Sequence, residues 1–107
     1  MGASRGEETA AMTLAFSHEA RDDLVRLRSF IAAQDPAAAE RVAASLVRGI
    51  ERVVRHPQIG KRVSIGPGES APDEIRDWLV GPYVVRYLIA ADRIVVLRVW
   101  HGREQRE

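Results

Sequence analysis

The feature that most constrains the fold is a series of three β-rich runs in residues 75–103. The runs are Ile75–Val80, Tyr83–Ala90 and Ile94–His101, with breaks at Gly81–Pro82 and Ala91–Asp92. Branched and aromatic side chains favour strands, and links of two to four residues are too short to hold a helix. Strands joined by such links run antiparallel. The sequence therefore predicts a three-stranded antiparallel meander, one face of which the upstream residues must cover.

Side chains alternate between the two faces of a strand, and this alternation assigns a core face and an outer face. The residues expected on the core face are Val85, Tyr87, Ile89, Val95, Leu97 and Val99. Those expected on the outer face are Val84, Arg86, Leu88, Ile94, Val96, Arg98 and Trp100. Because the outer face is also fairly apolar, we expect a partner protein to cover it.

The upstream residues show the pattern of a short strand and two helices. Thr13–Phe16 is the strand, and Ser17 is placed to cap a helix that continues to about Gln34. Asp35–Pro36 begins a second helix that continues to about Arg55, because aspartate caps and proline fits the first helical turn. The predicted fold is α+β, with an antiparallel helical hairpin packed on one face of an antiparallel sheet.

Length and composition indicate one small domain without special chemistry. Residues 12–107 form the domain, and residues 1–11 are expected to be a disordered leader, a cloning remnant or a misplaced start before Met12. The net charge is +1, and there is no cysteine. A thiolate metal site is thus excluded, the three histidines lack ligand spacing, and no run approaches the roughly 20 apolar residues of a membrane span. We expect a cytoplasmic protein with no cofactor and no metal.

No catalytic motif is present, and the candidate functional residues are a set of cationic and aromatic side chains near the sheet. They are Lys61, Arg62, Arg76, Arg86, Arg98, Trp100, His101 and Arg103. Two interpretations stay open. The set forms a basic groove for a carboxylate-rich peptide or a phosphate backbone, or its arginine stems simply cover apolar neighbours on a solvated face. His101 is suited either to proton transfer or to closing the last strand by hydrogen bonding.

Five short motifs occur in a fixed order and carry a resemblance to a known family. They are A-x-x-D-L at 20–24, D-P-x-A-A at 35–39, H-P-x-x-G-K at 56–61, Y-x-V-x-Y at 83–87 and R-V-x-H-G-R at 98–103. Over nearly all of residues 13–104 the chain resembles the ParE branch of the ParE/RelE toxin superfamily, also called plasmid stabilisation proteins. The resemblance implies the same fold. It also implies a type II toxin that arrests growth, inhibits DNA gyrase without being an enzyme, and is neutralised by a ParD-like antitoxin.

The resemblance also assigns expected roles to the candidate residues. Antitoxin binding is expected of Arg76, Arg86, Arg98 and Trp100, and target binding of Lys61, Arg62, His101 and Arg103. The toxin alone is not expected to bind nucleic acid specifically or to bind membranes. A homodimer or a heterotetramer with the antitoxin is the expected assembly.

Two alternatives to gyrase inhibition remain. RelE relatives cut mRNA on the ribosome, and in that case the catalytic residues would be Arg76, Arg86, Arg98 and His101. The tail after Trp100–His101 lacks a tyrosine and Lys61 is the only lysine, and both departures favour ParE. The other alternative is an inactive module that only binds its antitoxin.

Overall fold

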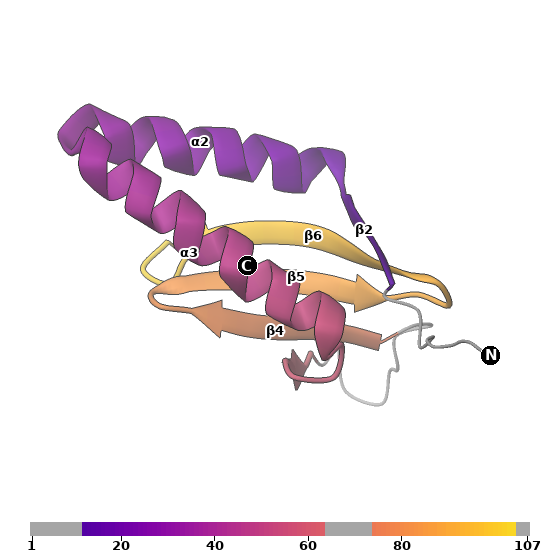
Figure 1. Ribbon diagram of the computed structural model, residues 1–107. Helices are drawn as coiled ribbons and strands as arrows, with labels where there is room; N and C mark the ends of the chain where they lie inside the picture. Colours follow the sequence, from indigo (N-terminus) through magenta and orange to yellow (C-terminus); the bar gives the residue numbers. More distant parts are fainter. Residues whose placement is uncertain (1–11, 64–73, 105–107) are drawn as a thin grey trace.

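The structure is a computed structural model, and it describes residues 12–63 and 74–104. The elements follow the predicted order, from a strand through two helices to a meander (Figure 1). Their bounds are β2 Thr13–Phe16, α2 His18–Gln34, α3 Pro36–Arg55, β3 Lys61–Arg62, β4 Glu74–Val80, β5 Tyr83–Ile89 and β6 Arg93–His101. The predicted α+β fold class is confirmed. The proposed leader at 1–11 lies outside the described residues.

The five strands form one sheet in the order β2-β6-β5-β4-β3. The pairs β3–β4, β4–β5 and β5–β6 are antiparallel, as the short links require. The N-terminal strand instead pairs in parallel with β6, with Thr13 opposite Arg93 and Phe16 opposite Val96. The sheet is therefore mixed. The two helices separate β2 from the meander in sequence, so no short link forces β2 to run antiparallel to its neighbour β6.

Both helices begin where the capping residues predict. The Ser17 hydroxyl accepts the Ala20 N–H at 3.0 Å, and the Asp35 carboxylate accepts the Ala37 and Ala38 N–H groups at 3.1 and 3.2 Å. These bonds satisfy donors that the first helical turn leaves without a partner. Asp35 is also the last residue of the link between the helices, so α2 and α3 must fold back on each other as a hairpin. Within the described chain, neither helix is long and apolar enough to cross a bilayer.

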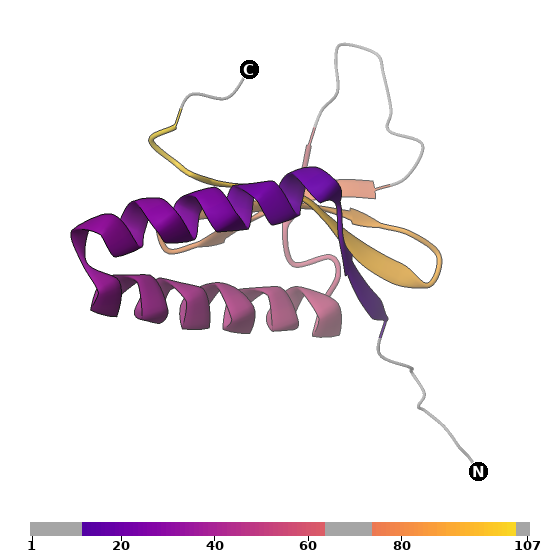
Figure 2. The same ribbon diagram turned by 90° about the horizontal axis from the view of Figure 1, so that it is seen from above.

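The core lies between the helical hairpin and one face of the sheet, and both helices lie on that side (Figure 2). The fully buried side chains with the largest volumes are Tyr87, Ile94, Val53, Val85, Val96 and Val99. Burial of such side chains is the main stabilising contribution in a domain of this size. The hairpin therefore fixes which face of the sheet is internal and which is available to other molecules.

One face assignment made from strict alternation is wrong on half of β6. Arg86 pairs with Arg98, but the next residue of β5, Tyr87, pairs with Val96, so Leu97 is an extra residue in β6. A β-bulge of this kind reverses the phase of the side chains that precede it. Ile94 and Val96 are consequently in the core at 0 and 1 % exposure, whereas Val95 faces outward. Beyond the bulge the assignment holds, with Val99 inside and with Arg98 and Trp100 outside.

Candidate functional site

The face of the sheet opposite the helices is the first candidate surface. Residues that lie directly opposite each other on paired strands share a face, so the register defines it. This outer sheet face consists of Ile75, Asp77, Leu79, Val84, Arg86, Leu88, Val95, Arg98 and Trp100. No helix of the described chain packs on it, and apart from Trp100 its apolar side chains are only partly buried. It is an apolar surface that carries a few charged groups.

Arg86 lies in the centre of the outer sheet face, where its charge is already compensated. Its Nε and Nη2 atoms donate to the two Asp77 carboxylate oxygens at 2.8 and 3.0 Å. Its guanidinium carbon also lies 5.1 Å from the centroid of the buried Trp100 ring, which is cation–π distance. These hydrogen bonds to Asp77 outweigh desolvation and raise the pKa of Arg86 above its ordinary value. Arg86 is therefore a fixed, charge-paired group within an apolar surface.

Arg98 is also held by a carboxylate, that of Asp23 on α2. Its Nε and Nη2 atoms donate to Asp23 at 2.8 and 3.0 Å, and the Val99 N–H donates to the same carboxylate at 2.9 Å. Arg26 adds a fourth hydrogen bond at 3.2 Å. Burial alone would raise the pKa of Asp23, but these donors outweigh it and the pKa lies below its ordinary value of 3.8. Asp23 is thus a buried anion that links α2 to the sheet.

Side chains of other elements close the edge of β6 beyond the end of β2. The Ser17 hydroxyl donates to the Leu97 carbonyl at 2.8 Å, and Asp23 accepts the Val99 N–H. Farther along, the Glu104 carboxylate accepts the His101 N–H at 2.7 Å. A free strand edge exposes such groups for pairing with another chain. Here they have intramolecular partners, so this edge is not available for an added strand.

Arg76 does not belong to the outer sheet face. It pairs with Tyr87, so it lies on the face that the helices cover, and the expectation that it shares a groove with Arg86 and Arg98 is wrong. Its guanidinium donates to the Gln58 and Gly60 carbonyls at 3.0 and 2.6 Å and forms an ion pair with Glu74. These bonds fix the segment after α3 against β4. Alternation along β4 shows only which β4 side chains share a face with Arg76. The pairing of β4 with β5 is needed to show which face of the sheet that is.

A groove between α2 and the end of β6 is the second candidate surface. Its volume is about 700 Å³. It is lined by Arg26, Leu27, Phe30, Ile31, Tyr83, His101, Arg103 and Glu104, and we call it the tail groove. The His101 ring meets the Tyr83 ring edge-on at 5.2 Å, and its Nδ1 accepts the Arg103 N–H at 3.0 Å. Because Nδ1 accepts this hydrogen bond, Nε2 is the ring nitrogen that carries a hydrogen.

The four residues predicted to contact the target divide into two pairs. His101 and Arg103 line the tail groove, whereas Lys61 and Arg62 form β3 at the other side of the sheet, with β5 and β4 between. Both β3 side chains are exposed, and the Arg62 Nε lies 3.9 Å from a Glu74 carboxylate oxygen. A single small ligand does not reach both pairs, but a protein partner has the size to contact both.

Comparisons with known proteins agree with this architecture. The sequence model described as the ParE toxin of the type II toxin–antitoxin system parDE matches residues 14–106. The chain belongs to the ParE toxin family. It is 31 % identical over 103 residues to Toxin RelE1 of Caulobacter vibrioides, a match that covers 88 % of this chain and 97 % of that toxin. It is 29 % identical over 91 residues to Toxin RelE3 of the same organism, covering 81 and 90 %.

A solved structure supports the same fold. It is described as a chromosomal ParDE system from P. aeruginosa, and its matching chain gives a TM-score of 0.67 at 19 % identity. The match covers 85 % of this chain and 96 % of that one. The family match makes the chain a toxin of a ParDE-type system, and the solved structure shows that its fold is shared with a protein of low sequence identity.

In this ParE-family chain, the residues that would serve a nuclease do not converge. Arg86 and Arg98 lie on the outer sheet face, Arg76 lies on the opposite face, and His101 lies in the tail groove. Phosphoryl chemistry requires cations and an acid–base group around one reacting phosphate. Each of the three arginines instead pairs with a carboxylate of its own chain. The arrangement is that of structural cross-links.

Asp23 is the central residue that sequence reasoning missed. A signal existed, because Asp23 lies within the apolar stripe of Ala20, Leu24 and Leu27 on α2, where a carboxylate is unexpected. Its partner Arg98 is 75 positions away in the sequence, and nothing local indicates the pairing.

Proposed function

We propose that this chain is a non-enzymatic toxin that inhibits DNA gyrase and is held inactive by a ParD-like antitoxin. The observation that supports a non-enzymatic role is the scatter of the candidate catalytic residues over three separate surfaces, with each arginine bound to an internal carboxylate. Because the described residues form no constellation for chemistry, the proposed mode of action is binding. Family membership supports gyrase as the molecule that is bound.

An inhibitor of this kind acts by differential affinity for the states of its target. If the toxin binds gyrase more tightly while the DNA is cleaved, it shifts the population toward that state. A shift from 1:99 to 99:1 requires about 10⁴-fold tighter binding to the favoured state. The tail groove is suited to such a contact, because the aromatic side chains of Phe30 and Tyr83 lie beside the charged groups of Arg103 and Glu104.

The outer sheet face is the proposed binding surface of the antitoxin. It is apolar and free of helices in the described chain, and we expect a flexible antitoxin segment to fold on it, partly as a helix and partly as an added strand. Because the far edge of β6 is closed by side chains and β3 pairs with part of β4, the strand would add to the part of β4 that extends beyond β3, where Leu79 is 65 % exposed. Arg86 would meet a carboxylate of that segment at the centre of the face.

The gyrase proposal is tested with purified toxin, gyrase and a relaxed plasmid. We expect loss of supercoiling and, after denaturation with detergent and protease, linear plasmid from trapped cleavage complexes. The same toxin in complex with its antitoxin is the matched control and should leave supercoiling intact. Normal supercoiling with free toxin, together with translation-dependent cleavage of messages in cells, would refute the proposal in favour of an endoribonuclease. The similarity of this chain to two toxins named RelE makes an endoribonuclease the second candidate function.

The antitoxin surface is tested by placing one charge on each side of the molecule. Leu88→Glu changes the outer sheet face, whereas Val25→Glu changes an α2 side chain that is 66 % exposed. We expect Leu88→Glu to weaken antitoxin binding by at least tenfold in calorimetry and Val25→Glu to leave it unchanged. Reversing Arg98 is unsuitable here, because a carboxylate facing Asp23 would disturb the fold itself. Equal affinities for both variants would exclude the outer sheet face.

A further inference from the structure

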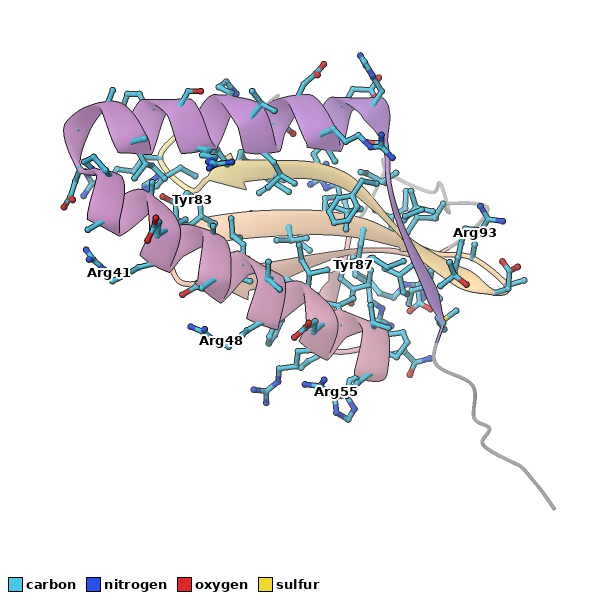
Figure 3. The ribbon with its side chains drawn as sticks, turned by 45° about the horizontal axis from the view of Figure 1, so that its top comes forward. Arg41, Arg48, Arg55, Tyr83, Tyr87 and Arg93 are labelled. Atoms are coloured by element: carbon cyan, nitrogen blue, oxygen red, sulfur yellow. The ribbon has the colours of Figure 1, made fainter. Side chains whose placement is uncertain are left out.

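Four arginines form a straight row on α3. They are Arg41, Arg48, Arg52 and Arg55, and we call them the arginine ridge. At about 100° per residue they fall within an arc of roughly 60°, and at 1.5 Å rise per residue they span about 21 Å. Figure 3 shows Arg41, Arg48 and Arg55 projecting from the side of α3 that faces away from α2. All four residues are exposed.

The arginine ridge differs from the arginines of the sheet in its lack of internal partners. Within residues 12–63 and 74–104, none of the four ridge guanidiniums lies in ion-pair distance of a carboxylate, and the one recorded bond runs from Arg48 to the Ser45 hydroxyl at 3.4 Å. The helix carries two acidic residues near the ridge, Glu40 directly before Arg41 and Glu51, which lines the same cleft as Arg48, Arg52 and Arg55. The sheet arginines, in contrast, are neutralised by carboxylates. The uncompensated positive charge of α3 is therefore concentrated on the ridge.

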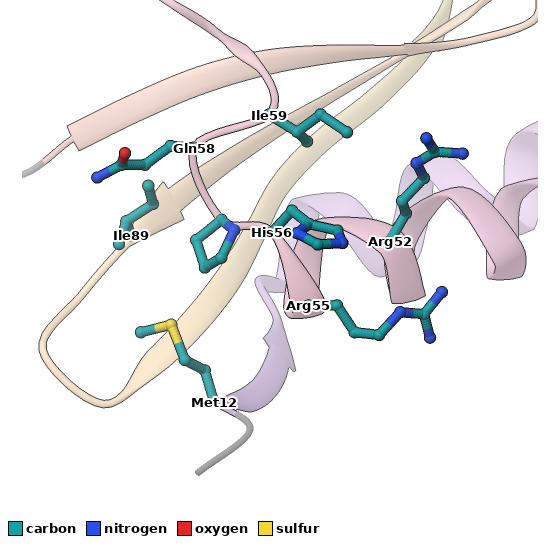
Figure 4. Close-up of a pocket in the computed structure, with 8 residues that line it drawn as sticks. Met12, Arg52, Arg55, His56, Gln58, Ile59 and Ile89 are labelled. Carbon is teal, nitrogen blue, oxygen red and sulfur yellow. The ribbon is translucent and has the colours of Figure 1, made fainter. Parts of the chain in front are cut away.

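The two flanks of α3 have different chemistry. The flank toward α2 carries Val42, Ala43, Leu46, Val47 and Ile50. No other α3 side chain falls within the arc of the row between Arg41 and Arg55, whereas the clefts beside it are lined by Trp78, Leu79 and Val80 of β4. At its C-terminal end the ridge borders a hollow of about 730 Å³, where Arg52, Arg55 and His56 stand opposite Met12 and Ile89 (Figure 4).

From this geometry we infer that the arginine ridge binds the sugar–phosphate backbone of duplex DNA. The uncompensated positive charge of the ridge matches interfaces with DNA, which are much more positively charged than protein–protein interfaces. Guanidinium groups bind phosphate oxygens in a fork geometry. The binding is independent of base sequence, because contacts to phosphate oxygens carry no sequence information. The inference rests on the proposed function, in which the bound DNA is the segment held by gyrase.

The test compares two double substitutions of the same charge and spacing. Arg41→Gln with Arg48→Gln removes half of the ridge, and Arg21→Gln with Arg28→Gln removes two exposed arginines seven residues apart on α2. The probe is a fluorescein-labelled 20-base-pair duplex, and its anisotropy is followed from about 50 to 200 mM salt. Four neutralised phosphates give a log–log salt slope of about −3.6, and two give about −1.8. Circular dichroism checks that each variant keeps its helices.

We expect the wild type and the α2 variant to share the steep slope, and the ridge variant to bind roughly 30-fold more weakly at 0.15 M salt. Equal losses in the two variants, or no binding by the wild type at 50 mM salt, would overturn the inference. Displacement of the probe by duplex or single-stranded RNA at tenfold lower concentration than by DNA would also overturn it. If the ridge binds DNA as expected but the toxin leaves supercoiling intact, the gyrase proposal fails while the ridge assignment stands.

Discussion

The buried carboxylate of Asp23 should be the most sensitive charged position among the residues that the structure describes. It is 4 % exposed and holds the Arg98 guanidinium, the Val99 N–H and Arg26 together at the edge of β6. Asp23→Ala removes all these acceptor atoms. Asp23→Asn keeps one oxygen for the Val99 N–H but removes the charge that faces Arg98. The two substitutions therefore separate the backbone contact from the ion pair.

The cost of Asp23→Ala follows from the groups it leaves without partners. A buried N–H without an acceptor costs about 1–3 kcal/mol, which applies to Val99. Arg98 loses two charge-assisted bonds, but its side chain is 34 % exposed and regains water, so we assign only about 1–2 kcal/mol to that loss. The sum is roughly 3 kcal/mol for Asp23→Ala and about 1–2 kcal/mol for Asp23→Asn. For a domain of this size, 3 kcal/mol lowers Tm by about 12–24 °C.

Urea unfolding followed by tryptophan fluorescence measures these differences directly. The midpoint should fall in the order wild type, Asp23→Asn, Asp23→Ala, with an unchanged m value. Asp22→Asn is the matched control, because Asp22 is the neighbouring aspartate and is 70 % exposed, and its one ion-pair partner in the described part of the chain is His18 at 3.3 Å. It should change the free energy of unfolding by less than about 0.5 kcal/mol. Equal midpoints for the Asp22 and Asp23 variants would show that the edge contact has no structural role.

Three further predictions concern acid, packing and the tail. Because the folded pKa of Asp23 lies below its ordinary value of 3.8, its stabilising contribution is fully present above about pH 5 and is lost as pH falls through the folded pKa. The stability gap between wild type and Asp23→Asn, measured by urea unfolding, should thus be constant from pH 8 to 5 and narrow below about pH 4. Gly60→Ala should cost about 1–3 kcal/mol in the same assay, because the new Cβ would lie 2.8 Å from both the Asp77 carbonyl and the Tyr87 hydroxyl; an unchanged midpoint would contradict this. Removing residues 102–107 deletes the Glu104 contact and one wall of the tail groove, so growth arrest should be lost while antitoxin binding in a pull-down persists; full toxicity would exclude the groove.

Local chemistry made the element boundaries predictable. Ser17, Asp35 and Pro36 act on the first turn of a helix within three residues of themselves, so their effect is visible in the sequence. The short links of the meander likewise determine strand direction. These features account for the fold class and for both helix starts. They say nothing about how separate elements contact each other.

The candidate site was less predictable because it depends on register and on contacts between distant residues. The extra residue at Leu97 reverses the faces of Ile94–Val96, yet no glycine or proline marks it in the sequence. The face of Arg76 follows only from its pairing with Tyr87. The high arginine content of the sequence does not indicate which guanidinium groups form ion pairs with carboxylates of the same chain.

The distribution of ion pairs therefore bears on where partners bind. Arg86 and Arg98 each make two parallel bonds to one aspartate, an arrangement that lysine cannot reproduce, and the two pairs tie β4 to β5 and α2 to β6. Substituting either arginine changes the free energy of unfolding together with any contact to a partner, so a loss of toxicity there is ambiguous. Surfaces where cations lack internal carboxylates, or where apolar side chains are exposed, are free of this ambiguity. The arginine ridge and Leu79, which is 65 % exposed on the outer sheet face, are positions at which binding can be altered without first weakening the fold.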